Sequence, residues 1–307
     1  MMGFTIRAVT SAFGEIEVPL KDLFLDSQKT ISKTGIQKVY ETKDTALELA
    51  SRALNGLLEE NSLGRQDIDC LIYVTQSPSF FLPSGACLLQ HMCGLSQKLL
   101  AFDIGQGCSG FVQALSISSK LSQSFGNIVI VCSDTYRSKI HPTDRSTSML
   151  FSDAASATWL TSDRTIEILA ESHMTDGSGR DFLYHKVPSS KDPEFIHMSG
   201  ADVLLFAQKY VPLEIKRALE ICGTDSSQVS NWFFHQASKL VLDSLDKRIS
   251  SHVPAHRNLE QIGNTVSSSI PILLKDDLKS LESGINVICG FGVGLSIATL
   301  VIGPCSN

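Results

Sequence analysis

The amino-acid sequence predicts an α/β fold, in which helices cover sheets, and three observations lead to this prediction. Apolar runs of strand length alternate with segments whose apolar residues recur at helical spacing. The order helix, polar turn, strand at residues 47–74 occurs again at residues 213–234. A glycine, a reactive-looking polar residue, small residues and a helix occur at 107–121 and again at 263–278, offset by about 160 residues. Such alternation is typical of α/β proteins.

Local patterns predict the elements of the first part of the chain. Residues 47–74 comprise an amphipathic helix, a polar turn and a strand, and Thr45 and Glu48 fit a capping box at the helix start. The apolar run "LLAFDI" at 99–104 has the length of a fully buried strand. After a glycine-rich turn, apolar residues at helical spacing predict a helix over 111–121.

The second part repeats these elements in the same order. Gly223 is placed to end the helix of the repeated helix–turn–strand unit. The strand "GNIVIVCSD" at 126–134 is echoed by "GINVICGFG" at 284–292. Echoes in one order and at a similar offset predict an ancient duplication whose two copies pack as pseudo-symmetric halves, residues 1–165 and 166–307.

The composition limits the classes of function. The chain has 307 residues, a formal net charge of −6, 43% hydrophobic and 19% charged residues, as expected for a globular protein with an ample core. The negative charge, without a clustered basic patch, argues against nucleic-acid binding. We find no membrane-spanning apolar run and no signal-peptide pattern at the N-terminus. Eight cysteines without Cys-x-x-Cys spacing indicate neither a zinc ribbon nor a redox pair, and we expect a cytoplasmic protein.

Cys108 is the candidate nucleophile. It lies in the turn "GQGCSG", immediately before a predicted helix. A thiol at a helix N-terminus meets unpaired backbone N–H groups and the positive end of the helix dipole, and both favour the thiolate. Free cysteines are also often small core residues, so the position alone leaves both interpretations open.

Two further residues are predicted to meet Cys108. If the halves superpose, the turn carrying Asn264 faces the turn carrying Cys108, and the strand end "WFFHQAS" brings His235 to the same place. A thiolate accepts an acyl group from a thioester at little energetic cost. Imidazole and carboxamide N–H groups together bind the oxygen of a developing enolate. The three loops therefore predict thioester chemistry.

These residues lie in stretches that resemble the β-ketoacyl-acyl-carrier-protein synthase III family, the initiating condensing enzymes of the thiolase-like superfamily. The resemblance runs from about "KTGI" at Lys33 to the C-terminus. The stretches that carry it, in order and spacing, are "DIGQGCSGFVQAL", "PTDRSTSMLFSDAASA", "FFHQAS", "QIGNTVSSSIP" and "GFGVGLS".

The resemblance implies a thiolase-like five-layered αβαβα fold and, usually, a homodimer. It implies that Cys108 takes an acyl group from an acyl-CoA or similar thioester. A malonyl thioester, usually on acyl carrier protein, then loses carbon dioxide while His235 and Asn264 stabilise its enolate, and the carbanion attacks the acyl-Cys108. The resemblance implies no metal or redox cofactor.

The resemblance also assigns the surroundings of the site. The oxyanion would be held by the N–H of Cys108 and by the loop of Phe291, Gly292, Val293 and Gly294. The acyl pocket would involve Phe81, Leu82 and Tyr136. Binding of CoA or the carrier protein would involve Lys33, Arg145, Lys239 and Lys247.

Several positions depart from the family pattern. Lys29 stands where a tryptophan usually stacks on the CoA adenine, and Lys33 stands at an arginine position. The loss of that stacking surface would weaken CoA binding by about 1–3 kcal/mol. Val293 replaces the middle glycine of the loop, so a side chain stands where backbone approaches the substrate. Leu82 and Tyr136 replace a phenylalanine and a leucine of the acyl pocket.

Alternatives stay open at this point. A thiolase-like acyltransferase would pass the acyl group to an alcohol or amine without forming a carbon–carbon bond, and the presence of Asn264 favours condensation over it. A non-catalytic partner subunit would not need an intact Cys108, His235 and Asn264. A papain-like protease also uses cysteine, histidine and asparagine, but its "CGSCW" signature is absent from the sequence.

Overall fold

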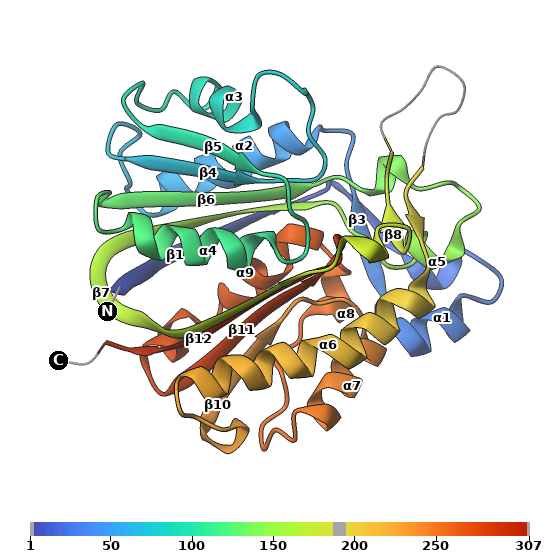
Figure 1. Cartoon of the computed structure of the whole chain (residues 1–307). Coiled ribbons are helices and arrows are strands. Elements are labelled where there is room, and N and C mark those ends of the chain that lie inside the picture. Colours follow the sequence, from blue (N-terminus) through green and yellow to red (C-terminus); the bar gives the residue numbers. More distant parts are fainter. Residues whose placement is uncertain (1–2, 187–194, 306–307) are drawn as a thin grey trace.

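An eight-stranded mixed sheet runs through the centre of the computed structural model, which describes residues 3–186 and 195–305 (Figure 1). The strand order is β10-β11-β12-β7-β6-β4-β5, and β1 pairs with β7. The strands are β1 (Gly3–Phe13), β4 (Cys70–Val74), β5 (Leu100–Ile104), β6 (Asn127–Asp134), β7 (Ala154–Thr175), β10 (Val229–Phe234), β11 (Ile285–Gly292) and β12 (Ser296–Pro304). Two small sheets pair β2 (Ile16–Pro19) with β3 (Lys38–Glu41) and β8 (Leu183–Tyr184) with β9 (His197–Met198).

The long strand β7 joins two regions of this sheet. Its first part, Ala154–Thr161, pairs antiparallel with β6 and with most of β1. Its second part, Ile166–Thr175, pairs antiparallel with β12. On one side β4 runs parallel to both β5 and β6, and on the other β10 runs parallel to β11. With β11 antiparallel to β12, the series β1-β7-β6-β4 and the series β7-β12-β11-β10 therefore have the same order of pairings: antiparallel, antiparallel and then parallel.

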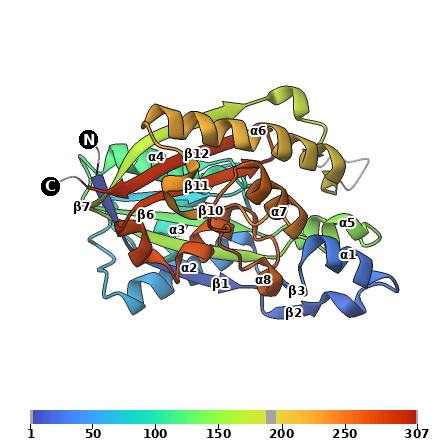
Figure 2. The ribbon, with the colours of Figure 1, turned by 90° about the horizontal axis from the view of Figure 1, so that it is seen from below.

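Helices form three layers around and between these strands (Figures 1 and 2). The outer helices α2 and α3 share a buried cluster with β4 and β6, and α6 and α7 share another with β10, β11 and β12. A third cluster unites α4 and α9 with strands from both regions. The result is the predicted α/β fold with five αβαβα layers. The helices are α1 (Ser27–Thr34), α2 (Ala46–Glu60), α3 (Gly85–Met92), α4 (Gly110–Leu121), α5 (Arg145–Ser148), α6 (Gly200–Ile221), α7 (Lys239–Arg248), α8 (Leu259–Ile262) and α9 (Ser269–Leu274).

Several local predictions are confirmed. Thr45 and Glu48 form the capping box at the start of α2. Gly223 has a φ of 69° directly after the cap of α6, a backbone conformation that glycine adopts without strain. A helix follows Cys108 as predicted, because the apolar residues of α4 recur at helical spacing and are buried in the cluster that α4 shares with α9 and the strands.

The prediction of a fully buried strand at 99–104 is wrong. The structure places this segment as β5 at the end of the sheet order, half-buried along most of its length, with Leu100 42% exposed. An apolar run indicates that the side chains of a strand can be buried, but it does not show whether other residues of the same chain cover them. Across the described residues, we also find no helix with the length and apolar character needed to cross a membrane.

Candidate active site

Cys108 lies in the turn between β5 and the first residue of α4, and only 6% of it is exposed. Strand β11 passes directly against it. A Cβ on Gly292 would lie 3.1 Å from the Cys108 Sγ, and a Cβ on Gly290 would lie 2.6 Å from the Cys108 carbonyl oxygen. Two glycines of β11 therefore let this strand approach Cys108 at backbone distance.

The pKa of the Cys108 thiol is shifted in the opposite direction from the prediction. Burial raises its pKa, and the nearby carboxylate of Asp134 raises it further. The helix N-terminus was expected to favour the thiolate, but removal of the thiol from water outweighs that field. The resting group is a neutral thiol, which needs a proton acceptor before it can attack.

His235 supplies a neutral imidazole to the same chamber. It directly follows β10, and its backbone N–H donates to the Cys289 carbonyl at 3.0 Å. Its Nδ1 lies 2.7 Å from the hydroxyl oxygen of Ser269, and its ring meets that of Phe291 edge-on. Burial lowers its pKa to about 3, so the ring is uncharged at neutral pH. When Ser269 donates to Nδ1, the ring proton lies on Nε2.

Asn264 is held by hydrogen bonds on both sides of its backbone. Its N–H donates to the Leu150 carbonyl at 2.9 Å, and its own carbonyl accepts from the N–H of Ser152 at 2.9 Å. The side-chain oxygen accepts from the N–H of Val266 at 3.0 Å. Because the oxygen is engaged in this way, the amide NH₂ is the end left to donate to a ligand.

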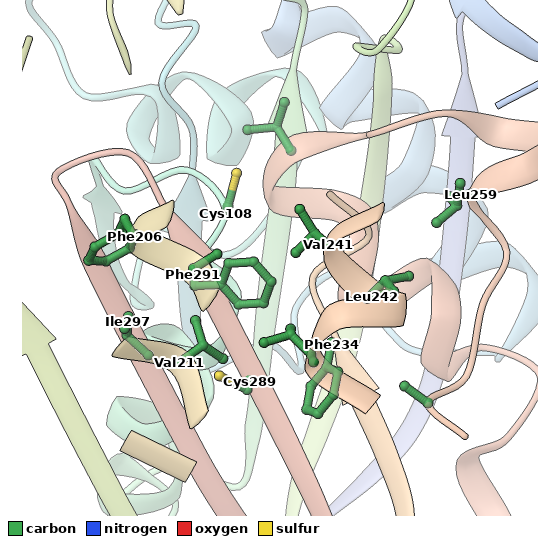
Figure 3. Close-up of a cluster of buried hydrophobic side chains, with 14 of the residues drawn as sticks. Cys108, Phe206, Val211, Phe234, Val241, Leu242, Leu259, Cys289, Phe291 and Ile297 are labelled. Atoms are coloured by element: carbon green, nitrogen blue, oxygen red, sulfur yellow. The ribbon is translucent and has the colours of Figure 1, made fainter. Parts of the chain in front are cut away.

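A chamber of about 240 Å³ brings Cys108, His235 and Asn264 together. Apart from these three residues, its inner wall is mainly apolar, with Phe151, Leu183 and Phe291 among its lining residues. Figure 3 shows Cys108 at the border of the hydrophobic cluster that contains Phe291. Such a wall excludes water, which strengthens the hydrogen bonds that the three polar groups can offer to a substrate.

The remaining predicted site residues fall into separate places. Phe291 and Gly292 line the chamber with Cys108, whereas Val293 and Gly294 line a neighbouring cavity. Tyr136 is buried and lines that second cavity. Phe81 and Leu82, in contrast, are 78% and 86% exposed and line neither cavity.

The predicted cations lie on helices near the chamber or on the surface beyond it. Lys33, at the end of α1, is exposed and lines the chamber. Arg145 pairs with Asp26 at 2.5 Å, and its guanidinium lies over the ring of Phe24. The remaining two lie on α7: Lys239 pairs with Asp243 of the same helix, and Lys247 is exposed in its last turn.

Two supporting residues escaped the sequence reasoning. Ser269 orients the imidazole of His235, and nothing in the run "SSS" distinguishes it from its neighbours. Asp134 is fully buried, and its carboxylate accepts from the N–H of Gln76 and from the hydroxyl of Ser267 at 2.5 Å. A carboxylate that ends the apolar run "IVIVC" was the available indication.

The five layers, with a cysteine, a histidine and an asparagine converging on one water-excluding chamber, are those of a thiolase-like condensing enzyme. The model of the 3-oxoacyl-[acyl-carrier-protein] synthase III family matches residues 102–177, and the model of that family's C-terminal part matches residues 219–303. Together the two matches cover more than half of the chain. The chain belongs to this family.

Individual relatives agree with this membership. The chain is 32% identical over 290 residues to β-ketoacyl-[acyl-carrier-protein] synthase III of Streptococcus agalactiae, covering 88% of each chain. It is 32% identical over 305 residues to the same enzyme of Gloeobacter violaceus, covering 92% of each. Among solved structures, 3-oxoacyl-(acyl-carrier protein) synthase of Burkholderia xenovorans superposes with a TM-score of 0.89 at 29% identity, covering 97% of this chain and 93% of that one. The priming β-ketosynthase of the R1128 polyketide pathway superposes with a TM-score of 0.86 at 25% identity, covering 97% and 95%.

Proposed function

We propose that the protein catalyses decarboxylative condensation of an acyl group, first carried on Cys108, with a malonyl thioester to give a β-ketoacyl product, as in the initiation of fatty-acid synthesis. One observation carries the proposal: Cys108, His235 and Asn264, from three loops far apart in the sequence, line a single chamber. The names of the relatives favour this function over acyl transfer to an alcohol or amine and over a non-catalytic subunit.

In the loading step, the Ser269 hydroxyl accepts from Nδ1–H of His235, and the free Nε2 of the neutral imidazole accepts the proton of the Cys108 thiol. The thiolate attacks the carbonyl carbon of the acyl thioester, and the oxyanion is held by the N–H of Cys108 and an N–H of the Phe291–Gly294 segment. The leaving thiolate takes the proton back from the imidazolium as the acyl–sulfur bond to Cys108 is completed. One thioester replaces another, and His235 returns to its neutral form.

In the condensation step, the Ser269 hydroxyl donates to Nδ1 of His235, so that Nε2–H and the amide of Asn264 donate to the thioester oxygen of the malonyl group. Loss of carbon dioxide leaves an enolate whose charge these donors stabilise. Its carbon attacks the acyl carbonyl on Cys108, the carbon–sulfur bond breaks, and the Cys108 thiolate takes up a proton from solvent. The release of carbon dioxide makes the step effectively irreversible. These residues perform both steps with the thioesters of CoA or acyl carrier protein as substrates and without a further cofactor.

We propose that the substrate's carrier approaches along α1, α5 and α7, which lie on one side of the molecule (Figure 2). Lys33 at the chamber supports this route, and Arg145, Lys239 and Lys247 would add positive charge for the phosphates of CoA or an acidic carrier protein. A homodimer would form at the opposite part of the sheet. The open edge of β5 and the exposed side chains of Phe81 and Leu82 support that interface.

The proposed duplication divides the chain at residues 1–165 and 166–307. This boundary lies within β7, between the part that pairs with β6 and the part that pairs with β12. The common order of parallel and antiparallel neighbours in the two regions supports the division. In this arrangement the first half carries Cys108 and the second carries His235 and Asn264.

Acyl loading tests the proposed function. The protein is incubated with acyl-CoAs and acyl carrier proteins, and intact-protein mass spectrometry records the added mass. We expect one acyl group per chain, none on Cys108→Ala, and unchanged loading on Cys87→Ala, because Cys87 is exposed and outside the chamber. Equal loading of Cys108→Ala and the wild type would contradict the assignment of the nucleophile.

A further inference from the structure

A second cavity, of about 440 Å³, adjoins the chamber of Cys108. Leu183 lines both cavities. The chain also continues from Gly292, which lies against the Cys108 Sγ, to Val293 and Gly294, which line the second cavity. The residues that follow Gly292 in the chain therefore lead directly from the Cys108 thiol, where an acyl group would be attached, to the second cavity.

The two cavities differ in the chemistry of their walls. The wall around Cys108 is mainly apolar, whereas the second cavity, although most of its surface is also apolar, is lined by several hydrogen-bonding side chains. These are Thr75, Gln76, Tyr136, Lys139, Arg180, Tyr184 and His185. Among the described residues, no aspartate or glutamate lines this cavity. Tyr136, Gln76 and Lys139 keep hydrogen-bonding capacity beyond their partners within the protein, and an oxygen substituent can use this capacity whereas a hydrocarbon chain cannot.

The polar pair closest to the nucleophile is Tyr136 and Gln76. The Tyr136 hydroxyl donates to the Gln76 Oε1 at 3.0 Å, and the Gln76 Nε2 donates to the Gly105 carbonyl at 3.3 Å. The same Oε1 would lie 2.4 Å from a Cβ on Gly107. The pair thus rests on the backbone of the turn that carries Cys108, and the Tyr136 ring is only 6% exposed.

Two cations lie farther along the cavity. Lys139 is partly buried and its ammonium donates to the Thr135 carbonyl at 2.8 Å. The buried carboxylates of Asp134 and Asp153 also act on this ammonium, but they do not line the cavity. Arg180 is exposed, and its Nε lies 3.8 Å from a carboxylate oxygen of Asp181. An ion pair of two exposed side chains is weak, so the guanidinium can still bind an oxygen acceptor.

We propose that the acyl group loaded on Cys108 carries an oxygen substituent, a hydroxyl or a carboxylate, that binds in the second cavity. The inference rests on the proposed function, because it concerns the acyl group that Cys108 receives. Both substituents accept hydrogen bonds. A hydroxyl near the thioester meets Tyr136 and Gln76, and a terminal carboxylate meets Lys139 and Arg180. A site built to hydrogen-bond a substrate discriminates strongly against the analogue that lacks the partner.

The test compares three acyl donors with four-carbon chains: butyryl, 3-hydroxybutyryl and succinyl thioesters, each on CoA and on acyl carrier protein. We expect kcat/KM for loading to be at least about 10-fold higher for one oxygen-bearing donor than for butyryl. Butyryl that loads as fast as both others would overturn the inference while the proposed function stands. Failure of every donor to load wild-type protein would overturn both.

Variants then assign the substituent to the cavity. The measured quantity is the ratio of oxygen-bearing to butyryl loading on one sample, because this ratio does not depend on the fraction of folded protein. We expect Tyr136→Phe to lower the 3-hydroxybutyryl ratio, or Lys139→Met to lower the succinyl ratio, by at least about 5-fold. Tyr40→Phe, a matched change on β3 outside both cavities, should leave the ratios unchanged. Ratios that persist in both cavity variants would overturn the inference.

Discussion

The hydroxyl oxygen of Ser269 lies 2.7 Å from Nδ1 of His235, and both groups are buried. Ser269 begins α9, in the helical layer between the two regions of the sheet, while His235 directly follows β10. The bond therefore links the central helical layer to the imidazole of His235. It also determines which ring nitrogen carries the proton that an enolate oxygen would accept.

Replacement of Ser269 by alanine should slow decarboxylation by about 5-fold, because a buried hydrogen bond worth about 1 kcal/mol no longer selects the productive tautomer. The measurement is kcat for carbon dioxide release from a malonyl thioester. Ser268→Ala is the matched control, since its hydroxyl donates to the Cys132 carbonyl and does not touch His235. Equal losses in the two variants would show that Ser269 acts only on the local structure.

Asn264→Ala should retain acyl loading and lose about 100- to 1000-fold in decarboxylation, because one of two donors to the enolate oxygen is removed. Mass spectrometry measures the first activity and carbon dioxide release the second. The two readouts separate the donor role from a general loss of folding, which would lower both. Unchanged decarboxylation would instead favour acyl transfer without condensation.

Gly292→Ala should lower kcat/KM for acyl loading by at least about 10-fold. The added methyl would lie 2.9 Å from the Cys108 Cβ and 3.1 Å from its Sγ, so the nucleophile must shift. Gly177→Ala is the control, because a Cβ at this position meets no described atom within 4 Å. Full loading activity in Gly292→Ala would show that the chamber accommodates the methyl without moving the thiol.

Acid should destabilise the protein partly through His235. Burial lowers the pKa of His235 to about 3, whereas a histidine in the unfolded chain titrates near 6.5. Between these values the unfolded chain binds a proton that the folded chain excludes. The stability is therefore complete above about pH 6.5 and is lost as the pH falls toward 3. Relative to His235→Gln, we expect the wild type to lose about 2 kcal/mol of unfolding free energy between pH 7 and pH 5.

Urea unfolding of both proteins at pH 5, 6 and 7 provides the measurement. Asp134 and Asp153 titrate in the same window with the opposite sign, because burial raises the pKa of each to about 6. Both carboxyl groups are present in the wild type and in the variant, so their contribution cancels in the difference. Parallel stability curves for the two proteins would contradict a buried neutral His235.

The sequence by itself predicted the elements whose residues interact over short distances along the chain. The capping box of Thr45 and Glu48, the helix after Cys108 and the glycine that follows α6 were all placed correctly, because each depends on neighbours within a few residues. The motifs around Cys108, His235 and Asn264 also identified the chamber that the structure contains.

Only the tertiary structure decided what depends on burial and on contacts between distant segments. It placed β5 at an open edge, raised the pKa of Cys108 against the field of its helix, and separated Phe81 and Leu82 from both cavities. It also brought Ser269 to His235, and Gln76 to the turn of Cys108. Desolvation and such long-range contacts are set by how the layers pack, and neighbouring residues in the sequence carry no direct record of that packing.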